Sequence, residues 1–187
     1  GSHHKAAAST PRALETAELP QVVESYAQAT RNALQAGFDG VEIHAANGYL
    51  LDQFLCSNSN QRTDNYGGSV ENRARLVLDV VDAVIAAAGD AGIVGIRISP
   101  LGTFNGVEDA NPLETFSYLL GELNSRGLAY VHVNKPDWAG GSYEGFVVCD
   151  DVTAGAGGAF GLPMSLTIVQ SGDRIDAQNT VQVTPSG

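Results

Sequence analysis

The sequence predicts an α/β protein with parallel strands, and three observations point to this class. Segments with helical periodicity alternate with segments of strand periodicity three times along the chain. Glycine or proline residues mark most junctions between these segments. Each strand carries a polar side chain on one face near its end. Alternating helices and strands imply parallel strands that are joined by right-handed crossovers.

The first unit is a helix followed by a strand. Apolar residues recur at helical spacing between Val22 and Leu34, and Gly37 supplies a C-terminal stop. The strand at residues 39–44 alternates apolar and polar positions, with Glu42 and His44 on the polar face. We expect the helix to cover the apolar face of this strand.

The second unit begins at Ser69, a residue type that favours the N-cap of a helix. A helical pattern follows and ends near Gly89. The strand at residues 92–99 then places Ile96 and Ile98 on one face and Arg97 on the other. Helices can bury the isoleucine face, so Arg97 must face a cleft or a barrel interior.

The third unit opens with Asn111 as N-cap and Pro112 in the first helical turn. Its apolar stripe ends at Gly127, and the strand at residues 128–133 alternates His132 with valines. His44, Arg97 and His132 therefore share one predicted face at the strand ends. A buried Glu42–Arg97 ion pair is an alternative, purely structural interpretation of two of the polar residues on this face.

The turn after the first strand holds the strongest candidates for chemistry. His44, Asn47 and Tyr49 combine an imidazole, an amide and a phenol within six residues. In alternating α/β proteins, strand ends usually carry the functional groups. Each residue also has a simpler interpretation, because a single histidine is more often structural and Asn-Gly is a common turn dipeptide.

Composition excludes several classes of function. The formal net charge of −11 argues against a nucleic-acid surface and against attraction to anionic lipid. No apolar run approaches the ~18 to 20 residues of a membrane helix. Cys56 and Cys149 show neither metal spacing nor a disulfide framework, so we expect a cytoplasmic protein without a metal site. Residues 1–15 are expected to be a tag remnant and a flexible lead-in.

Three segments resemble the Old Yellow Enzyme family of FMN-dependent ene-reductases. They read GFDGVEIHAANGYLLDQFL, SNQRTDNYGGSVENRARLVLDVV and VGIRISP, and they lie between Gly37 and Pro100. The run from Asn60 to Arg73 is the most specific of these matches. The resemblance extends from about Thr10 to Gly145, which is about three quarters of the chain.

The resemblance implies a cofactor, a reaction and a role for four residues. In this family NAD(P)H reduces bound FMN, and a hydride then passes to the β-carbon of an α,β-unsaturated carbonyl compound. By resemblance, His44 and Asn47 donate hydrogen bonds to the substrate carbonyl oxygen, which stabilises negative charge there. Tyr49 delivers a proton as general acid, and Arg97 lies beside the flavin's pyrimidine edge. The expected partner is a small-molecule enone or another electron-poor alkene.

The resemblance also implies a partial TIM-type (β/α)8 barrel. Such a barrel takes about 250 residues, and this chain accommodates about three αβ units within residues 16–145. Residues 146–187 diverge and predict a Gly-rich hinge and a β-hairpin-like tail. Open sheet edges favour pairing with another chain, so we expect a homo-oligomer that shields them. The alternative is a non-catalytic truncated, recombined or designed barrel fragment that lacks the flavin phosphate site, in which the tail caps one edge.

Overall fold

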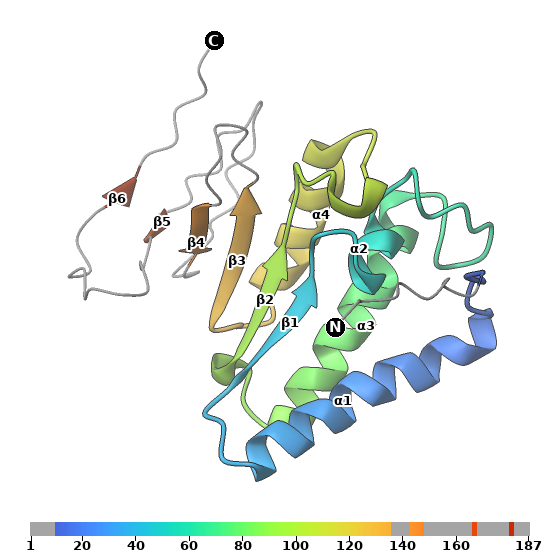
Figure 1. Ribbon diagram of the computed structural model, residues 1–187. Coiled ribbons are helices and arrows are strands. Elements are labelled where there is room, and N and C mark those ends of the chain that lie inside the picture. The colour runs from blue at the N-terminus through green and yellow to red at the C-terminus, as the bar shows by residue number, and fades with distance from the viewer. Residues whose placement is uncertain (1–9, 136–142, 148–165, 168–179, 182–187) are drawn as a thin grey trace, which may run out of the picture.

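The computed structural model has a layer of helices packed on a mixed sheet, and it describes residues 10–135, 143–147, 166–167 and 180–181 (Figure 1). Its helices are α1 (Leu19–Gln35), α2 (Leu50–Leu55), α3 (Val70–Ala88) and α4 (Pro112–Asn124), with 3-10 turns at Thr16–Glu18, Ala91–Ile93 and Phe104–Gly106. Its strands are β1 (Val41–Ala45), β2 (Val94–Ile98), β3 (Tyr130–Lys135), β4 (Tyr143–Val147), β5 (Leu166–Thr167) and β6 (Thr180–Val181).

The main sheet has the strand order β1-β2-β3-β4. β1 pairs parallel with β2, and β2 pairs parallel with β3, which confirms the predicted α/β class with parallel strands. β4 adds to the outer edge of β3 in the antiparallel direction. β1 lies at the opposite end of this sheet, where its outer backbone groups form an edge.

Beyond the end of β4, the tail is described at two short strands. β5 and β6 pair antiparallel in a separate two-stranded sheet. The rest of the predicted hairpin and the predicted Gly-rich hinge lie outside the described residues, as do residues 1–9 of the predicted lead-in. Within residues 10–15, Arg12 forms an ion pair with Glu18, and the Leu14 carbonyl accepts a hydrogen bond from Arg62.

The core lies between the sheet and the helices, where α3 packs against α1, α2 and α4. Alternate residues of the parallel strands point into this core, and each is at most 3% exposed. They are Ile43, Ala45, Val94, Ile96, Ile98 and Val131. Because side chains alternate along a strand, the polar residues between them face the opposite side of the sheet. This arrangement is the one that the strand periodicity predicts.

Local signals fix the helix ends. The Ser69 hydroxyl accepts a hydrogen bond from the Asn72 amide, and Gly89 ends α3 at φ 78°, so both predicted ends are confirmed. Asn111 caps α4 through the Glu114 amide, with Pro112 in the first turn, as predicted. Helix α2 was not predicted, because six residues are too few to display helical periodicity.

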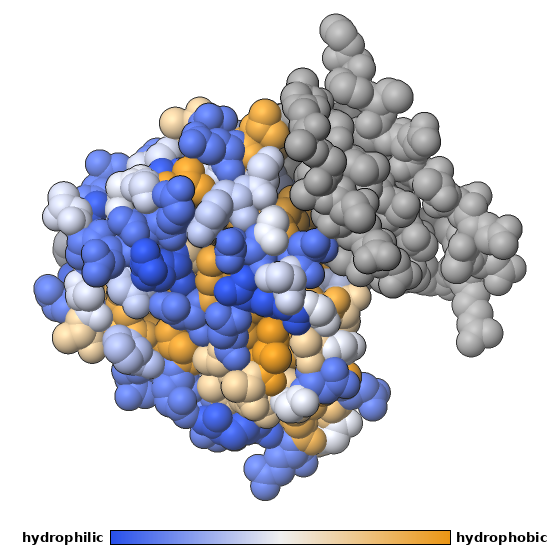
Figure 2. Space-filling model, turned by 180° about the vertical axis from the view of Figure 1, so that it is seen from behind, coloured by the Kyte–Doolittle hydropathy of each residue, from blue (hydrophilic) through white to orange (hydrophobic). Residues whose placement is uncertain are grey.

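The surface is mixed in character. Figure 2 shows hydrophilic residues over much of the described face seen from behind, with hydrophobic residues gathered in smaller patches between them. Of the large hydrophobic side chains that are exposed, Tyr49, Leu101 and Phe104 belong to the segments that follow β1 and β2. Among the helices of the described residues, none combines the length and the hydrophobicity needed to cross a membrane.

Candidate functional site

A row of polar residues crosses the three parallel strands close to their carboxyl ends. His44 on β1 is in register with Arg97 on β2, and Arg97 is in register with His132 on β3. Neighbours in register lie about 5 Å apart across a sheet and point to the same face. The structure therefore brings together the three strand-end residues that the sequence analysis assigned to one face.

Tyr49 lies beside His44. The two ring centroids are 5.2 Å apart with the planes tilted by 52°, and the Tyr49 side chain is half exposed. Tyr49 is the N-cap residue of α2, so the short helix that follows β1 sets its direction. A phenol that is open to solvent can donate a hydrogen bond or a proton to a neighbouring group.

Asn47 reaches across the end of the sheet. It adopts a left-handed backbone conformation, with φ at 58°. Its Oδ1 accepts a hydrogen bond of 2.7 Å from Nδ2 of Asn134, which lies two residues beyond His132 on the same face of β3. This contact makes Nδ2 the atom of Asn47 that is suited to donate to a ligand. The sequence analysis missed Asn134, although its spacing from His132 places both on one face.

The electrostatics of the row favour a neutral imidazole at His44. Partial burial lowers the pKa of His44 below its usual value, and the neighbouring Arg97 charge lowers it further. A neutral imidazole presents one N–H donor at neutral pH. Glu42 lies two residues before His44 on the same face of β1. Its Oε2 is 3.0 Å from Nδ1 of His132. The carboxylate on this face thus pairs with the histidine of the third strand.

A buried hydroxyl and a buried carboxyl lie under the turn that carries Asn47, and the sequence analysis missed their role. The Asn47 amide donates to Ser99 Oγ at 2.8 Å, and the Gly48 amide donates to Asp52 Oδ2 at 2.8 Å. The Ser99 hydroxyl in turn donates to the same carboxyl oxygen at 3.3 Å. Asp52 and Ser99 are each 2% exposed. We call these two residues the Asp52–Ser99 pair.

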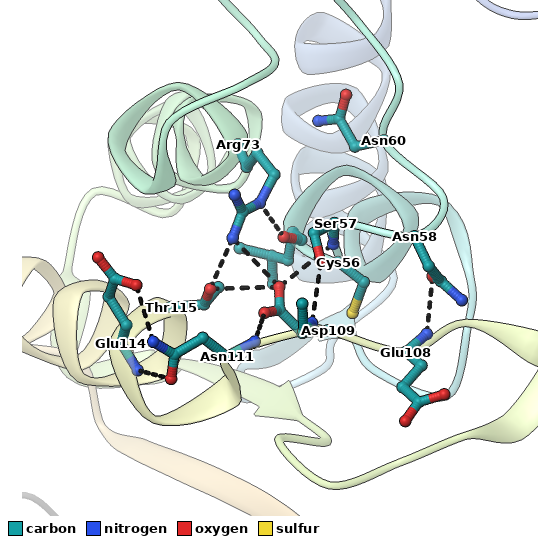
Figure 3. A network of polar contacts seen from close by, with 12 residues as sticks. Cys56, Ser57, Asn58, Asn60, Arg73, Glu108, Asp109, Asn111, Glu114 and Thr115 are labelled. Atoms are coloured by element: carbon teal, nitrogen blue, oxygen red, sulfur yellow. Dashed lines mark hydrogen bonds and ion pairs between the residues drawn. The ribbon is translucent and has the colours of Figure 1, made fainter.

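A second buried polar cluster joins α3 to the segment before α4 (Figure 3). Each nitrogen of the Arg73 guanidinium donates a hydrogen bond: Nε to the Leu55 carbonyl, Nη1 to the Gly68 carbonyl and Nη2 to Asp109 and Thr115. Asp109 Oδ2 also accepts from Thr115 Oγ1 and from the Ser57 amide. We call Arg73, Asp109 and Thr115 the Arg73 network. Its groups bond to one another and to backbone groups of Leu55, Ser57 and Gly68, none of which lies on a strand.

The loop before α3 is likewise held by its own side chains. Asn60 donates from Nδ2 to the carbonyls of Phe54 and Tyr66, each at 2.7 Å. Arg62 forms an ion pair with Asp64 and reaches the Leu14 carbonyl. The sequence segment with the most specific resemblance therefore builds the scaffold, while the groups suited to chemistry lie on β1, β2 and β3 and in the turn after β1.

Two further candidate chemistries receive no support here. Cys56 is buried, and burial raises the pKa of its thiol well above the usual range, so it is unreactive as a nucleophile. Cys149 lies outside the described residues. Within the part of the chain that the structure describes, no group of three or more His, Cys, Asp or Glu side chains is arranged to hold a metal ion.

Comparison with known proteins gives the chain a family context. The model of the NADH:flavin oxidoreductase / NADH oxidase family matches residues 2–146. The chain is 49% identical over 145 residues to the probable flavin mononucleotide-dependent alkene reductase of Leishmania infantum, an alignment that covers 72% of this chain and 40% of that protein. It is also 49% identical over 132 residues to 12-oxophytodienoate reductase 1 of Oryza sativa subsp. japonica, covering 70% of this chain and 34% of that one.

A similar solved structure is that of morphinone reductase. It superimposes with a TM-score of 0.68 and 54% sequence identity, and the match covers 73% of this chain and 36% of that one. The chain thus spans between about a third and two fifths of the length of these relatives. The matched segment contains the strand-end row, Asn47, Tyr49 and the Arg73 network.

Proposed function

Since this chain belongs to the NADH:flavin oxidoreductase / NADH oxidase family, which includes the Old Yellow Enzymes, we propose that it supplies the substrate-activating site of an FMN-dependent ene-reductase. The reaction is the reduction of the C=C bond of an α,β-unsaturated carbonyl compound with NAD(P)H. The observation that carries this proposal is the alignment of His44 with Arg97 in register, with Asn47 and Tyr49 in the adjoining turn.

The residues at the strand ends have the chemistry that a flavin and an enone require. Arg97 is a permanent cation on the face of the sheet away from the helices, and it suits the electron-rich pyrimidine edge of FMN. His44 and Asn47 supply neutral N–H donors, which suit a carbonyl oxygen. Phe104, whose backbone lies against Gly48, adds an exposed apolar side chain beside the turn. The donor set therefore fits both groups.

His44 and Asn47 would bind and polarise the substrate. Two N–H groups that converge on the carbonyl oxygen stabilise the negative charge that grows there as the C=C bond is reduced. Removing one such donor typically costs ~10²-fold or more in rate when the charge is large. Since the lowered pKa keeps His44 neutral, it can donate without repelling Arg97.

Tyr49 would complete the addition by giving its phenolic proton to the carbon next to the carbonyl. FMN, when bound, would supply the hydride for the other carbon, with NAD(P)H as the reductant. Arg97 would hold the pyrimidine edge of FMN, where its positive charge would stabilise negative charge. The contact between the Tyr49 and His44 rings supports these roles, because it would keep the proton donor next to the carbonyl-binding groups.

The three parallel strands suit a middle segment of an eight-stranded barrel. Parallel strands with helices on one face and polar residues on the other are what a (β/α)8 barrel presents to its helices and its interior. In such a barrel the edge of β1 pairs with a preceding strand. We propose that the isolated chain shields this edge of β1 by self-association. Sedimentation analysis or light scattering would measure the oligomeric state.

The test is a flavin titration of the purified chain, followed by a ligand titration. Wild-type protein should take up FMN, turn yellow and bind a simple phenol, and the bound flavin should bleach with NADPH and reoxidise on addition of an enone. The double variant His44→Ala/Asn47→Ala should lose phenol binding by ~100-fold or more while keeping its circular dichroism spectrum. Tyr49→Phe should keep phenol binding and lose kcat, because it removes only the proton donor.

A matched control is the double variant Gln28→Ala/Asn32→Ala. These two amides hydrogen-bond to each other on the exposed face of α1, so their loss should change neither FMN uptake nor phenol affinity. A colourless protein that takes up no FMN would contradict the proposal and support a non-catalytic barrel fragment. Unchanged phenol affinity in the His44/Asn47 double variant would instead show that the ligand binds elsewhere.

A further inference from the structure

We infer that Asp52 and Ser99 are positioning residues for Asn47. Together they hold the Asn47–Gly48 turn in the conformation that directs the side-chain amide of Asn47 across the strand ends. The inference deepens the proposed function, because it rests on Asn47 as a donor to the substrate carbonyl. Neither residue is suited to touch the ligand, since each is 2% exposed.

The turn is one that needs outside support. Asn47 and Gly48 are consecutive residues with positive φ, at 58° and 70°. A left-handed conformation costs a non-glycine residue roughly 1–2 kcal/mol, so Asn47 holds it at the expense of local energy. Asn tolerates this conformation better than most residues, yet a strained residue persists where its surroundings over-determine it.

The surroundings do so through four side chains. Ser99 accepts from the Asn47 amide and Asp52 accepts from the Gly48 amide, while Asn105 donates to the Asn47 carbonyl at 3.1 Å and Gln53 donates to the Gly48 carbonyl at 2.7 Å. Every backbone polar group of the two residues therefore meets a side chain. These side chains come from α2 and from the segment after β2, so the turn is pinned from two sides.

Asp52 and Ser99 are distinguished from the other two by burial. The Ser99 hydroxyl bridges the two supports, since it accepts from Asn47 and donates to the Asp52 oxygen that also receives Gly48. The two amides and the hydroxyl thus form one continuous chain of hydrogen bonds that ends at a carboxylate. Movement of Ser99 would rotate the Ala46–Asn47 peptide, and movement of Asp52 would rotate the Asn47–Gly48 peptide. These two peptides flank the Cα atom that carries the Asn47 side chain, so either movement would redirect it.

The burial of Asp52 points away from a role in stability alone. Removing a carboxylate from water is costly, and burial raises the pKa of Asp52 despite the hydrogen bonds that it accepts. Burial thus disfavours the ionised form of this carboxyl, while its hydrogen bonds go to the turn and to the hydroxyl that supports the turn. Its donors are neutral: the Gly48 amide, the Ser99 hydroxyl and the Cys56 thiol.

The test uses Ser99→Ala and Asp52→Asn in the full chain, with Thr115→Val as the matched control. Thr115 is also a buried hydroxyl that accepts from one group, Arg73, and donates to a buried carboxylate, Asp109. The control thus loses the same kind of bridge in a cluster whose hydrogen bonds described above do not include Asn47 or Gly48. Two quantities are measured in each variant: amide hydrogen exchange at Asn47 and Gly48, and phenol affinity of the FMN-loaded protein.

We expect Ser99→Ala to speed exchange of the Asn47 amide by roughly 10-fold, and Asp52→Asn to do the same for Gly48. Phenol affinity should fall by roughly 10-fold in both, with the enone KM rising more than kcat falls. Thr115→Val should change neither quantity. Unchanged exchange and affinity in the two variants, or an equal loss in Thr115→Val, would overturn the inference.

The exchange rates of the two backbone amides also allow this inference to be tested separately from the proposed function. If the wild-type chain binds no phenol, the proposed function fails, and the exchange rates of Asn47 and Gly48 still decide whether Asp52 and Ser99 hold the turn. If Asp52→Asn does not fold, Ser99→Ala alone carries the test, because it removes one hydroxyl and adds no polar group.

Discussion

The Asp52–Ser99 pair and the Arg73 network contain the same kinds of polar groups but hold different segments of the protein. Each has a buried carboxyl that accepts hydrogen bonds from a hydroxyl and from a backbone N–H. The donors are Ser99 and Gly48 for Asp52, and Thr115 and Ser57 for Asp109. In the Arg73 network a guanidinium also bonds to the carboxyl and ties it to α3. Under the Asn47 turn the donors are neutral, and the held segment faces the open strand ends.

The difference teaches that the role of a buried polar group depends on the segment that it holds, as well as on its burial and its hydrogen bonds. The Arg73 network joins α3, α4 and the loop after α2, so its loss should be felt as lost stability. The Asp52–Ser99 pair holds two residues of one turn, so its loss should be felt as lost ligand affinity. Variants that separate these two quantities test the comparison.

The largest effect is expected from Arg73→Met. Met keeps much of the apolar volume, but the change leaves the Asp109 carboxylate buried at 7% exposure without its cation. Breaking a buried ion pair in this way costs about 3–5 kcal/mol of unfolding free energy, which urea denaturation would measure. Phenol affinity of the remaining folded protein should not change, because the network does not reach the strand ends.

Arg75→Met is the control for this prediction. Arg75 lies on the same helix but is exposed, and it bonds to the Asn65 carbonyl and the Asn72 side chain. Its replacement should change the unfolding free energy by less than about 0.5 kcal/mol. Equal stability losses at Arg73 and Arg75 would mean that the buried network adds little to the fold.

The contrast also explains how much of the molecule was predictable from the sequence. The helix caps at Ser69 and Asn111 and the strand-end residues His44 and Arg97 follow local rules, namely capping chemistry and two-residue alternation, and local rules can be followed along one chain. The parallel order of the strands then places the end residues in one row without further information.

The supports of the site could not be predicted in the same way. Asp52 lies in the sequence LLDQFL, where a charged residue between apolar ones is normally on the outer face of a helix. Its partner Ser99 is 47 positions away, and no local pattern connects them. Arg73 was part of a specific sequence match, but a match does not tell whether a residue serves chemistry or packing.

A smaller effect, confined to the turn, is expected from Gly48→Ala. Gly48 has φ +70°, and an added Cβ would lie 2.3 Å from the Phe104 carbonyl oxygen, so the segment after β2 would have to move. We expect a loss of about 2 kcal/mol from the left-handed conformation and the contact together, with a fall in phenol affinity as Asn47 is displaced.

Gly89→Ala separates the two contributions. Gly89 has φ +78° at the end of α3, but nothing lies within 4 Å of the position of its missing Cβ. It should lose about 1 kcal/mol from conformation alone and leave phenol affinity unchanged. If both alanine variants lost the same unfolding free energy and neither lost phenol affinity, the close approach of Phe104 to the turn would not contribute to ligand binding.

The smallest effect is a pH dependence of stability at Asp52. Because burial raises the folded-state pKa of Asp52 above its unfolded value of about 3.9, the protonated carboxyl is favoured by folding. Its contribution to the unfolding free energy is therefore fully present below the unfolded pKa and is lost as pH rises through the folded pKa. Each unit of pKa elevation corresponds to ~1.4 kcal/mol.

Urea denaturation of the wild type and Asp52→Asn at pH 4 and at pH 7.5 measures this loss. The other carboxyl groups contribute equally to the pH dependence of both proteins. The unfolding free energy of the wild type minus that of the variant should therefore decrease as pH rises. The charge of His44 lowers the pKa of Asp52, but burial is the larger influence and raises it. A difference that increases with pH would show that the donors from Gly48 and Ser99 outweigh burial. The carboxylate would then stabilise the fold as Asp109 does, and the contrast between the two clusters would reduce to their location.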